Sequence, residues 1–235
     1  MTASTTSPLG RNLLLRTDSY KVSHWKQYPP GTQTVFSYIE SRGGSFSHGV
    51  FFGLQAFLRE YLSTPVTVAD IDEADAIFRL HGEPFNRDGW LQLVERHGGR
   101  LPLRIRAVPE GSVVPAHQVL ATVENTDPDF FWLTSYLETE LLRAIWYPTT
   151  VATVSAAAKA TLLRYLEANS EDTAGQIGFK LHDFGARGVS SNESAALGGL
   201  AHLVNFLGTD TVMALVAARR WYDCEMAGFS IPAAE

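Results

Sequence analysis

The part of this sequence that most constrains its fold is residues 178–222, where strand-like apolar runs alternate with helical patterns. Residues 178–184 and 204–208 are predicted strands, and residues 192–203 and 210–222 are predicted helices. Such alternation is typical of parallel βα units. Because a parallel sheet is normally buried on both faces, two units alone leave apolar faces and strand edges uncovered. We therefore expect these residues to open a larger βα fold whose remainder lies on another chain or has been lost.

The preceding residues have a mixed pattern of helices and strands with no regular alternation. A capping pair at Thr67 and Asp70 begins one predicted helix, and Asp127 followed by Pro128 begins another that ends at about residue 145. Residues 147–149 are predicted to break that helix before a new one at 151–168. We expect an α/β protein with a disordered tail (1–10), an α+β N-terminal domain (11–148) and the truncated first part of a β/α-barrel domain (149–235). Further strands are predicted at residues 35–40, 101–107, 113–114 and 119–123, and further helices at 51–62, 67–82 and 86–98.

Composition argues against several classes of protein. The net charge is −6, whereas nucleic-acid-binding proteins usually carry a basic face, so we expect no nucleic-acid partner. Cys224 is the only cysteine, which rules out an internal disulfide and fits a reducing compartment. No apolar run approaches the roughly 18 residues that a membrane helix needs, and residues 1–10 do not show the apolar h-region expected of a secretory signal. The histidines lack metal-ligand spacing, so we expect no protein-held metal. From the composition as a whole we expect a cytoplasmic protein with no membrane partner.

The turn after the first predicted strand carries side chains that suit a planar ligand beside phosphates. Phe184 ends the strand and is able to stack on a ring, although a phenylalanine at a strand end is more often part of the core. Arg187 follows in a glycine-containing turn and is able to bind phosphate oxygens in a bidentate manner. Ser190, Ser191 and Asn192 offer caps for the next helix, whose N-terminus favours anions. The alternative is a capped βα turn with a surface arginine.

Asp210 follows the second predicted strand and is a candidate acceptor for a carboxamide NH₂ group. It is equally a candidate N-cap for the helix that follows, and a carboxylate has enough lone pairs for both roles. The carboxyl ends of parallel strands are where ligands bind in barrels and open α/β sheets. Phe184, Arg187 and Asp210 are therefore expected to converge on one small heterocycle.

Seven longer stretches of the chain are more specific than these local patterns of strands, turns and caps. Together they make the chain similar to the nicotinamide-using enzymes of the nicotinate/nicotinamide phosphoribosyltransferase family, from about Asn12 to Glu235 in one order. The stretches are residues 17–21, 26–32, 51–55, 123–128, 146–153, 182–191 and 208–211.

The resemblance implies a pentosyltransferase reaction in NAD salvage. Nicotinamide and 5-phosphoribosyl 1-diphosphate give nicotinamide mononucleotide and diphosphate, with Mg²⁺ accompanying the diphosphate. The resemblance further implies a type II phosphoribosyltransferase barrel and a homodimer with active sites at the subunit interface.

The resemblance also assigns roles to residues of this chain. Phe184 would stack on one face of the pyridine, with Tyr20 of the partner subunit on the other face. Asp210 would accept a hydrogen bond from the carboxamide, and Arg187 would bind near the amide and the diphosphate. Asp18, together with the partner's Arg42, would line the site. Without the resemblance, the segment around Asp18 is interpreted as a helix start capped by Thr17 or Asp18, and Arg42 as a solvated loop residue.

The sequence departs from the family pattern in two respects. Ala186 stands where the family usually has tyrosine, which is expected to remodel one wall of the site. The family's histidine follows directly after the segment that ends here at Glu235, so we expect an N-terminal half, inactive without a C-terminal complement. Two alternatives remain: a nicotinate-type transferase, which Asp210 argues against, and a non-catalytic remnant that binds pyridines or dimerises.

Overall fold

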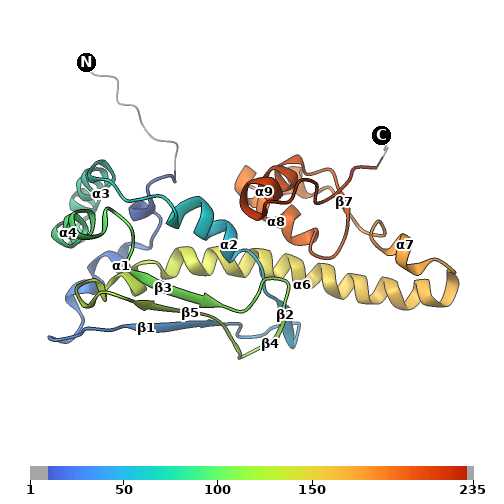
Figure 1. Ribbon diagram of the computed structural model, residues 1–235, viewed down its shortest axis with the longest axis horizontal. Coiled ribbons are helices and arrows are strands. Elements are labelled where there is room, and N and C mark those ends of the chain that lie inside the picture. The colour runs from blue at the N-terminus through green and yellow to red at the C-terminus, as the bar shows by residue number, and fades with distance from the viewer. Residues whose placement is uncertain (1–9, 232–235) are drawn as a thin grey trace, which may run out of the picture. The chain divides into compact units, whose positions relative to one another are not determined.

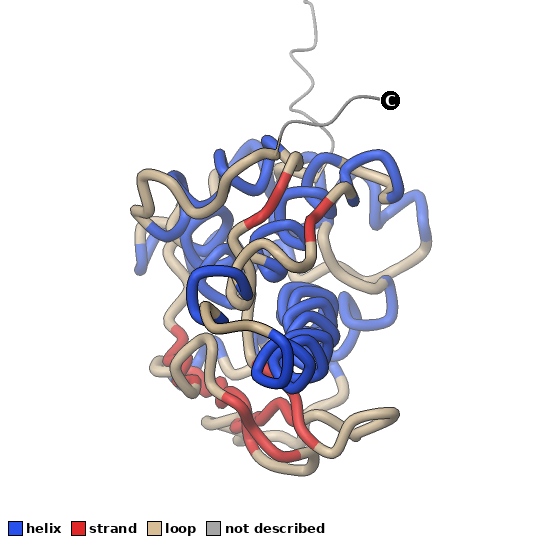
Figure 2. The backbone as a smooth tube through the Cα atoms, turned by 90° about the vertical axis from the view of Figure 1, so that its right-hand side faces the viewer, coloured by secondary structure: helices blue, strands red, loops and turns tan. Residues whose placement is uncertain are grey.

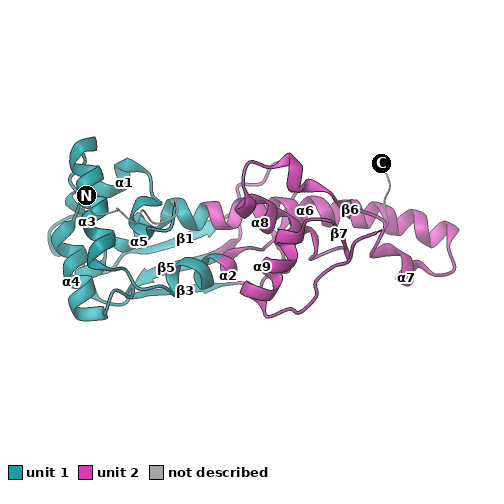
Figure 3. Ribbon diagram, turned by 90° about the horizontal axis from the view of Figure 1, so that it is seen from above, with its two compact units in different colours: residues 1–39, 57–107, 121–142 teal, residues 40–56, 108–120, 143–235 magenta. Residues whose placement is uncertain are grey.

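The computed structural model describes residues 10–231, whose contacts define two compact units (Figure 3). Unit 1 contains residues 10–39, 57–107 and 121–142, and unit 2 contains residues 40–56, 108–120 and 143–231. The chain therefore passes between the units several times. The predicted tail lies outside the described residues except for Gly10, and the predicted division into domains at residue 148 stays a prediction.

Unit 1 combines helices with most of a three-stranded sheet of order β1-β5-β3. Strand β3 pairs with β5 antiparallel, with Ile105 opposite Val123. The strands are β1 (Phe36–Glu40), β3 (Leu103–Ala107) and β5 (Val119–Asn125), and the α-helices are α1 (Ser19–Ser23), α3 (Val68–His81), α4 (Arg87–His97) and α5 (Leu133–Tyr136). Short 3₁₀ segments span Leu13–Leu15, His24–Lys26 and Pro128–Phe130, and a π-helical segment spans Leu58–Leu62.

Local capping chemistry sets the ends of two helices of unit 1. Thr67 and Asp70 form the expected capping box at the start of α3, which ends at Gly82 in the left-handed conformation. The Asn86 side chain accepts from the backbone N–H of Gly89 and so caps α4. Both predicted helix starts are confirmed.

The core of unit 1 centres on an aromatic cluster. The Trp90 ring is fully buried and lies edge-on to Trp132 and Tyr136, at centroid distances of 4.9 and 5.1 Å. The Tyr136 hydroxyl donates to the Leu14 carbonyl at 2.7 Å, so this buried phenol is satisfied. The cluster ties α4, α5 and the N-terminal 3₁₀ turn together.

Unit 2 contains the long helix, two two-stranded sheets and the βα region (Figure 1). Strands β2 and β4 are antiparallel, and strands β6 and β7 are parallel. The strands are β2 (His48–Val50), β4 (Val113–Pro115), β6 (His182–Asp183) and β7 (Gly208–Thr209), and the helices are α2 (Leu54–Phe57), α6 (Glu138–Asn169, which begins in unit 1), α7 (Thr173–Ile177), α8 (Asn192–His202) and α9 (Val212–Tyr222). Ala196, Leu200, Ala214, Ala218 and Trp221 belong to its buried core.

Several predicted boundaries were wrong. The helix expected to break at residues 147–149 instead continues through Pro148 as α6 (Figure 1). The helix expected from Asp127 to about residue 145 is divided into a 3₁₀ turn, α5 and the start of α6. The two strands of the βα region are only two residues long each, shorter than predicted. Strands are short throughout, and helices provide most of the regular structure (Figure 2). No helix in residues 10–231 is long and apolar enough to cross a membrane.

Helix α6 tolerates Pro148 next to a backbone segment that packs closely against it. Thr153 Oγ1 accepts from the Val50 N–H at 2.9 Å, and Thr149 Oγ1 accepts from the Phe52 N–H at 3.1 Å. The two threonines are four residues apart and therefore lie on one face of the helix. Their hydroxyls accept hydrogen bonds from the backbone N–H groups of Val50 and Phe52, as the carbonyls of a neighbouring strand would. They thereby fix residues 50–53 against α6.

Gly53 is predicted to be intolerant of a side chain. Its φ is +107°, and an added Cβ would lie 2.3 Å from Pro148 Cγ and 2.4 Å from the Ala144 carbonyl oxygen. We expect Gly53→Ala to lower the free energy of unfolding by about 2–4 kcal/mol, from backbone strain plus overpacking. The matched control is Gly111→Ala in the same unit, with φ +86° but no neighbour within 4 Å, which should cost only about 1–2 kcal/mol. Equal losses in chemical denaturation would contradict the packing argument.

Candidate active site at the ends of two parallel strands

The candidate site is built where β6 and β7 end. His182 pairs with Gly208 and Asp183 with Thr209, in parallel register. The residues that follow the two strands, Phe184 and Asp210, therefore leave the sheet next to each other. The Asp210 N–H donates to the Asp183 carbonyl at 2.9 Å, which extends the ladder by one step. This pairing confirms the predicted parallel βα units.

The Asp183 side chain holds the two strand ends together. Its Oδ1 accepts from the Gly185 N–H at 2.8 Å, and its Oδ2 accepts from Thr209 Oγ1 at 3.0 Å. Thr209 Oγ1 in turn accepts from the Thr211 N–H at 3.0 Å. One carboxylate therefore fixes the turn after β6 and links it to the turn after β7.

Asp210 is the charged centre of the site. Its Oδ1 accepts from Ser230 Oγ at 2.5 Å, and its Oδ2 lies 2.8 Å from His182 Nε2. The hydrogen bond from Ser230, reinforced by His182, lowers the pKa of Asp210 below its ordinary value despite some desolvation. The N-cap of α9 is Thr211, not Asp210. The capping alternative for Asp210 was therefore wrong, and its side chain instead contacts Ser230 and His182.

Phe184 presents its ring to the surface. The side chain is half-exposed, so the core interpretation was wrong. Its ring centroid lies 4.5 Å from that of His182, at an interplanar angle of 39°. The ring of Phe184, the imidazole of His182 and the carboxylate of Asp210 thus form one continuous cluster with an open aromatic face.

Arg187 lies in the 3₁₀ turn Gly185–Gly188, directly after Phe184, and it is exposed. The next helix, α8, begins at Asn192 and is capped by Ser191, whose side chain accepts from the Ser194 N–H at 3.1 Å. A guanidinium and a capped helix N-terminus close to the same turn are groups that attract phosphate oxygens.

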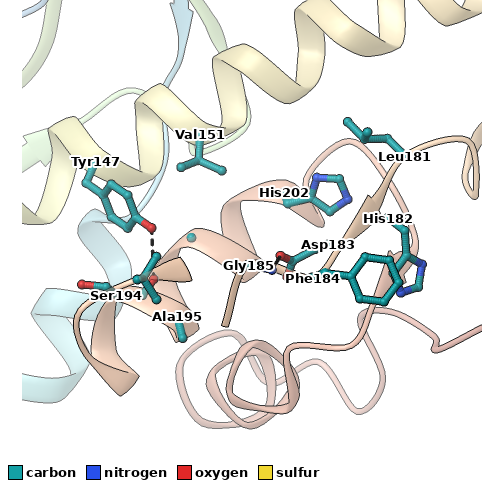
Figure 4. A pocket seen from close by; sticks show the side chains of 13 residues that line it. Tyr147, Val151, Leu181, His182, Asp183, Phe184, Gly185, Ser194, Ala195 and His202 are labelled. Atoms are coloured by element: carbon teal, nitrogen blue, oxygen red, sulfur yellow. Dashed lines mark hydrogen bonds between the residues drawn. The ribbon is translucent and has the colours of Figure 1, made fainter. Parts of the chain in front are cut away.

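A pocket of about 340 Å³ lies beside this cluster, between β6, α6 and α8 (Figure 4). The Tyr147 hydroxyl donates to the Ser194 carbonyl at its edge, at 3.3 Å, and burial together with the charge of Asp183 raises the pKa of Tyr147. His202 is buried at the other side, with Nδ1 3.1 Å from Ser155 Oγ. The pocket is lined by Tyr147, Val151, Leu181, His182, Asp183, Phe184, Gly185, Val189, Ser194, Ala195, Gly198, Gly199 and His202.

The remaining predicted site residues lie elsewhere in the chain. Asp18 and Tyr20 are in unit 1, where Asp18 Oδ2 accepts from Thr139 Oγ1 at 2.6 Å and Tyr20 is exposed. Asp18 is the N-cap of α1 but makes no side-chain capping bond. Arg42 is exposed in the loop between β1 and β2 of unit 2. Their assignment to the site stays a prediction.

Sequence reasoning missed the roles of His182 and Ser230. Alternation along a strand places His182 and Phe184 on the same face, which was a usable signal for His182. Ser230 carried no such signal, because its approach to Asp210 depends on the bridge between Phe229 and Gly208.

Metal-binding capacity in the described part of the chain is limited. Residues 10–231 contain no group of three or more His, Cys, Asp or Glu side chains arranged to hold a metal ion. Both oxygens of Asp183 and of Asp210 already accept hydrogen bonds or contact His182.

Asp183 is predicted to be needed for the stability of the strand ends. An asparagine retains only one acceptor oxygen, so Asp183→Asn should lose one of the two hydrogen bonds and lower the free energy of unfolding by about 1–3 kcal/mol. Asp88→Asn, on the exposed first turn of α4, is the control and should change it by less than about 1 kcal/mol. Similar values for both variants in urea unfolding would contradict the bridging role.

His202 is predicted to make the protein less stable in mild acid. Burial lowers its pKa, although Asp183 and nearby carbonyls act in the opposite direction. As the pH falls, His202 therefore binds a proton in the unfolded chain before it does so in the folded protein. The contribution of neutral His202 to the free energy of unfolding is complete above about pH 6.5 and is lost as the pH falls below that value. His202→Asn, which keeps a polar atom near Ser155, should reduce the loss between pH 7.5 and 5.5 by on the order of 1 kcal/mol. An unchanged pH profile would contradict this.

Two family models match parts of this chain. Residues 12–105 match the nicotinamide phosphoribosyltransferase N-terminal domain, and residues 179–235 match the nicotinate phosphoribosyltransferase family. The second match covers the strand ends that carry Phe184, Arg187 and Asp210.

Curated relatives extend the similarity over nearly the whole chain. A nicotinamide phosphoribosyltransferase of Xanthomonas campestris is 63% identical over 95% of this chain and 48% of its own length. One from Acinetobacter baylyi is 33% identical over 95% of this chain and 48% of its own length. This chain thus spans about half the length of these relatives.

Solved structures agree on the fold. Human nicotinic acid phosphoribosyltransferase superposes with a TM-score of 0.58 at 20% identity, covering 85% of this chain and 36% of that one. The nicotinate-nucleotide pyrophosphorylase of Pyrococcus furiosus gives 0.54 at 15% identity, covering 99% and 46%. The expected α/β fold is confirmed. By its sequence, the chain is similar to the nicotinate/nicotinamide phosphoribosyltransferase family, whose members it matches over about half their length.

Proposed function

We propose that this chain is half of an enzyme that transfers the phosphoribosyl group of 5-phosphoribosyl 1-diphosphate to the ring nitrogen of nicotinamide. The products are nicotinamide mononucleotide and diphosphate. The observation that carries the proposal is the cluster of Phe184, His182 and Asp210 at the ends of two parallel strands. The similarity to nicotinamide phosphoribosyltransferases over 95% of the chain supports it.

The half-exposed ring of Phe184 suits the heterocycle. Stacking holds the pyridine so that its nitrogen faces the reacting carbon. As the new bond forms, the ring becomes a pyridinium, and the face of an aromatic side chain favours that positive charge. The partner's Tyr20 is our proposal for the second face of this sandwich.

Asp210 suits the carboxamide. As a carboxylate with a lowered pKa it only accepts hydrogen bonds, and the amide NH₂ is a donor. Nicotinate would place a second carboxylate against it, a repulsion on the order of a few kcal/mol in a partly dry site. This argument favours the amide substrate over the acid.

The diphosphate requires positive charge as it leaves. We propose that Arg187 and the N-terminus of α8 supply part of it, together with the partner's Arg42. Asp18 of this chain would line the rim of the site. We further propose that Mg²⁺ arrives with the diphosphate, whose oxygens are the hard ligands that this ion prefers. The ion would neutralise charge on the leaving group.

The complete enzyme is proposed to be a cytoplasmic homodimer that includes a C-terminal complement to this chain. Matching relatives are about twice as long as the part they share with it. The later strands of the barrel would cover the apolar faces that β6, β7 and their helices present.

The first test supplies the missing half. This chain is co-expressed with the part of the Xanthomonas campestris relative that its match leaves uncovered, and diphosphate release is measured with and without nicotinamide. We expect nicotinamide-dependent release from the co-purified pair and negligible release from either part alone. A folded, associated pair without this activity would favour the alternative of a non-catalytic remnant.

Asp210→Ser in the active assembly tests the amide selectivity. Removing the carboxylate should raise the ratio of kcat/KM for nicotinate to that for nicotinamide by about tenfold or more, because a repulsion of at least about 1.4 kcal/mol is lost. Asp88→Ser is the matched control and should leave the ratio unchanged. An unchanged ratio in Asp210→Ser would contradict the selectivity argument.

A further inference from the structure

Each oxygen of the Asp210 carboxylate is held by a different side chain. His182 Nε2 lies 2.8 Å from Oδ2, and Ser230 Oγ lies 2.5 Å from Oδ1. The two contacts together fix the rotation of the carboxylate about its last bond. Its side chain nevertheless remains 34% exposed, so lone pairs are left for a ligand.

His182 is itself held firmly in place. Its side chain is only 9% exposed, although it lies at the surface end of β6. On one side the ring lies over Gly208, where an added Cβ would be 2.5 Å from His182 Nδ1. On the other side it contacts the ring of Phe184. Any side chain at position 208 would displace the imidazole.

The protonation pattern of the imidazole follows from its two nitrogens. Within the described residues, the buried Nδ1 has no hydrogen-bond partner, and a buried N–H without an acceptor is costly. The tautomer with its hydrogen on Nε2 fits the site, because that hydrogen points to Asp210.

Ser230 is brought to Asp210 by a separate segment. The Thr209 N–H donates to the Phe229 carbonyl at 2.9 Å, and the Phe229 N–H donates to the Leu207 carbonyl at 2.7 Å. These bonds place residues 229–230 next to β7, on the side away from β6. The Asp210 carboxylate is thus contacted from both sides of β7, by His182 of β6 and by Ser230 of the segment on the other side.

We propose that His182 is a positioning residue for substrate selection: seated on Gly208, it holds the Asp210 carboxylate, with Ser230 on the other oxygen, in the orientation that accepts a carboxamide. This proposal rests on the proposed function. A carboxylate that is already oriented loses no rotational freedom when the amide binds. His182 also contacts Phe184, so one imidazole aligns both groups that recognise the ligand.

The test measures nicotinamide kinetics in the co-purified assembly described above. His182→Leu keeps an apolar group over Gly208 but removes the donor, and His182→Gln returns an N–H at a similar reach. We expect His182→Leu to raise the KM for nicotinamide about tenfold with kcat changed less than about twofold. His182→Gln should recover most of the loss. His81→Leu, an exposed histidine on α3, is the matched control and should behave as the wild type.

Ser230→Ala provides a second test that does not depend on a buried position. It removes the donor to Oδ1 from an exposed side chain, and we expect it to raise the KM for nicotinamide about threefold.

Equal KM values in the wild type, His182→Leu and Ser230→Ala would overturn the positioning role while leaving the proposed function standing. Equal losses of kcat and of thermal stability in the leucine and glutamine variants would also overturn it, because they would indicate a purely structural histidine. A wild-type assembly without activity would instead contradict the proposed function, and the positioning role with it.

Discussion

The in-register parallel pairing of β6 with β7 is the constraint on which the site depends. Two residue pairs, His182 with Gly208 and Asp183 with Thr209, are enough to bring Phe184 and Asp210 together. Such a short pair has little ladder energy of its own, and the Asp183 carboxylate provides the additional connection between the two turns. Without that connection, an aromatic ring and a carboxylate from segments 26 residues apart (184 and 210) would have no reason to adjoin.

Because side chains alternate along β6, neighbouring residues of this segment have different roles. Asp183 points towards α8 and serves the fold, whereas His182 and Phe184 serve the site (Figure 4). The site face is consequently made of groups that stack and accept hydrogen bonds, with Arg187 in the adjoining turn. A pyridine carboxamide is the simplest ligand that uses all of these groups, which is why we favour it over its acid.

The sequence was a good guide where the signal is local. The capping box at Thr67, the cap at Asn86 and the βα alternation were all predictable, because their chemistry lies within a few residues. It was a poor guide where tertiary contacts decide. Pro148 was expected to end a helix, yet α6 continues because surrounding packing outweighs the lost hydrogen bond. Phe184 and Asp210 each had an ordinary alternative role, which the exposure of the Phe184 ring and the N-cap at Thr211 excluded. Ser230 was not predictable, since it reaches Asp210 through a bridge that no local pattern signals.

The most direct measurement of the central claim is a crystal structure of the complete assembly with nicotinamide bound. The account predicts that the pyridine lies against the Phe184 ring and that the carboxamide nitrogen lies about 3 Å from an oxygen of Asp210, with His182 still on Oδ2. A nicotinamide bound away from Phe184, or an amide turned away from Asp210, would contradict it.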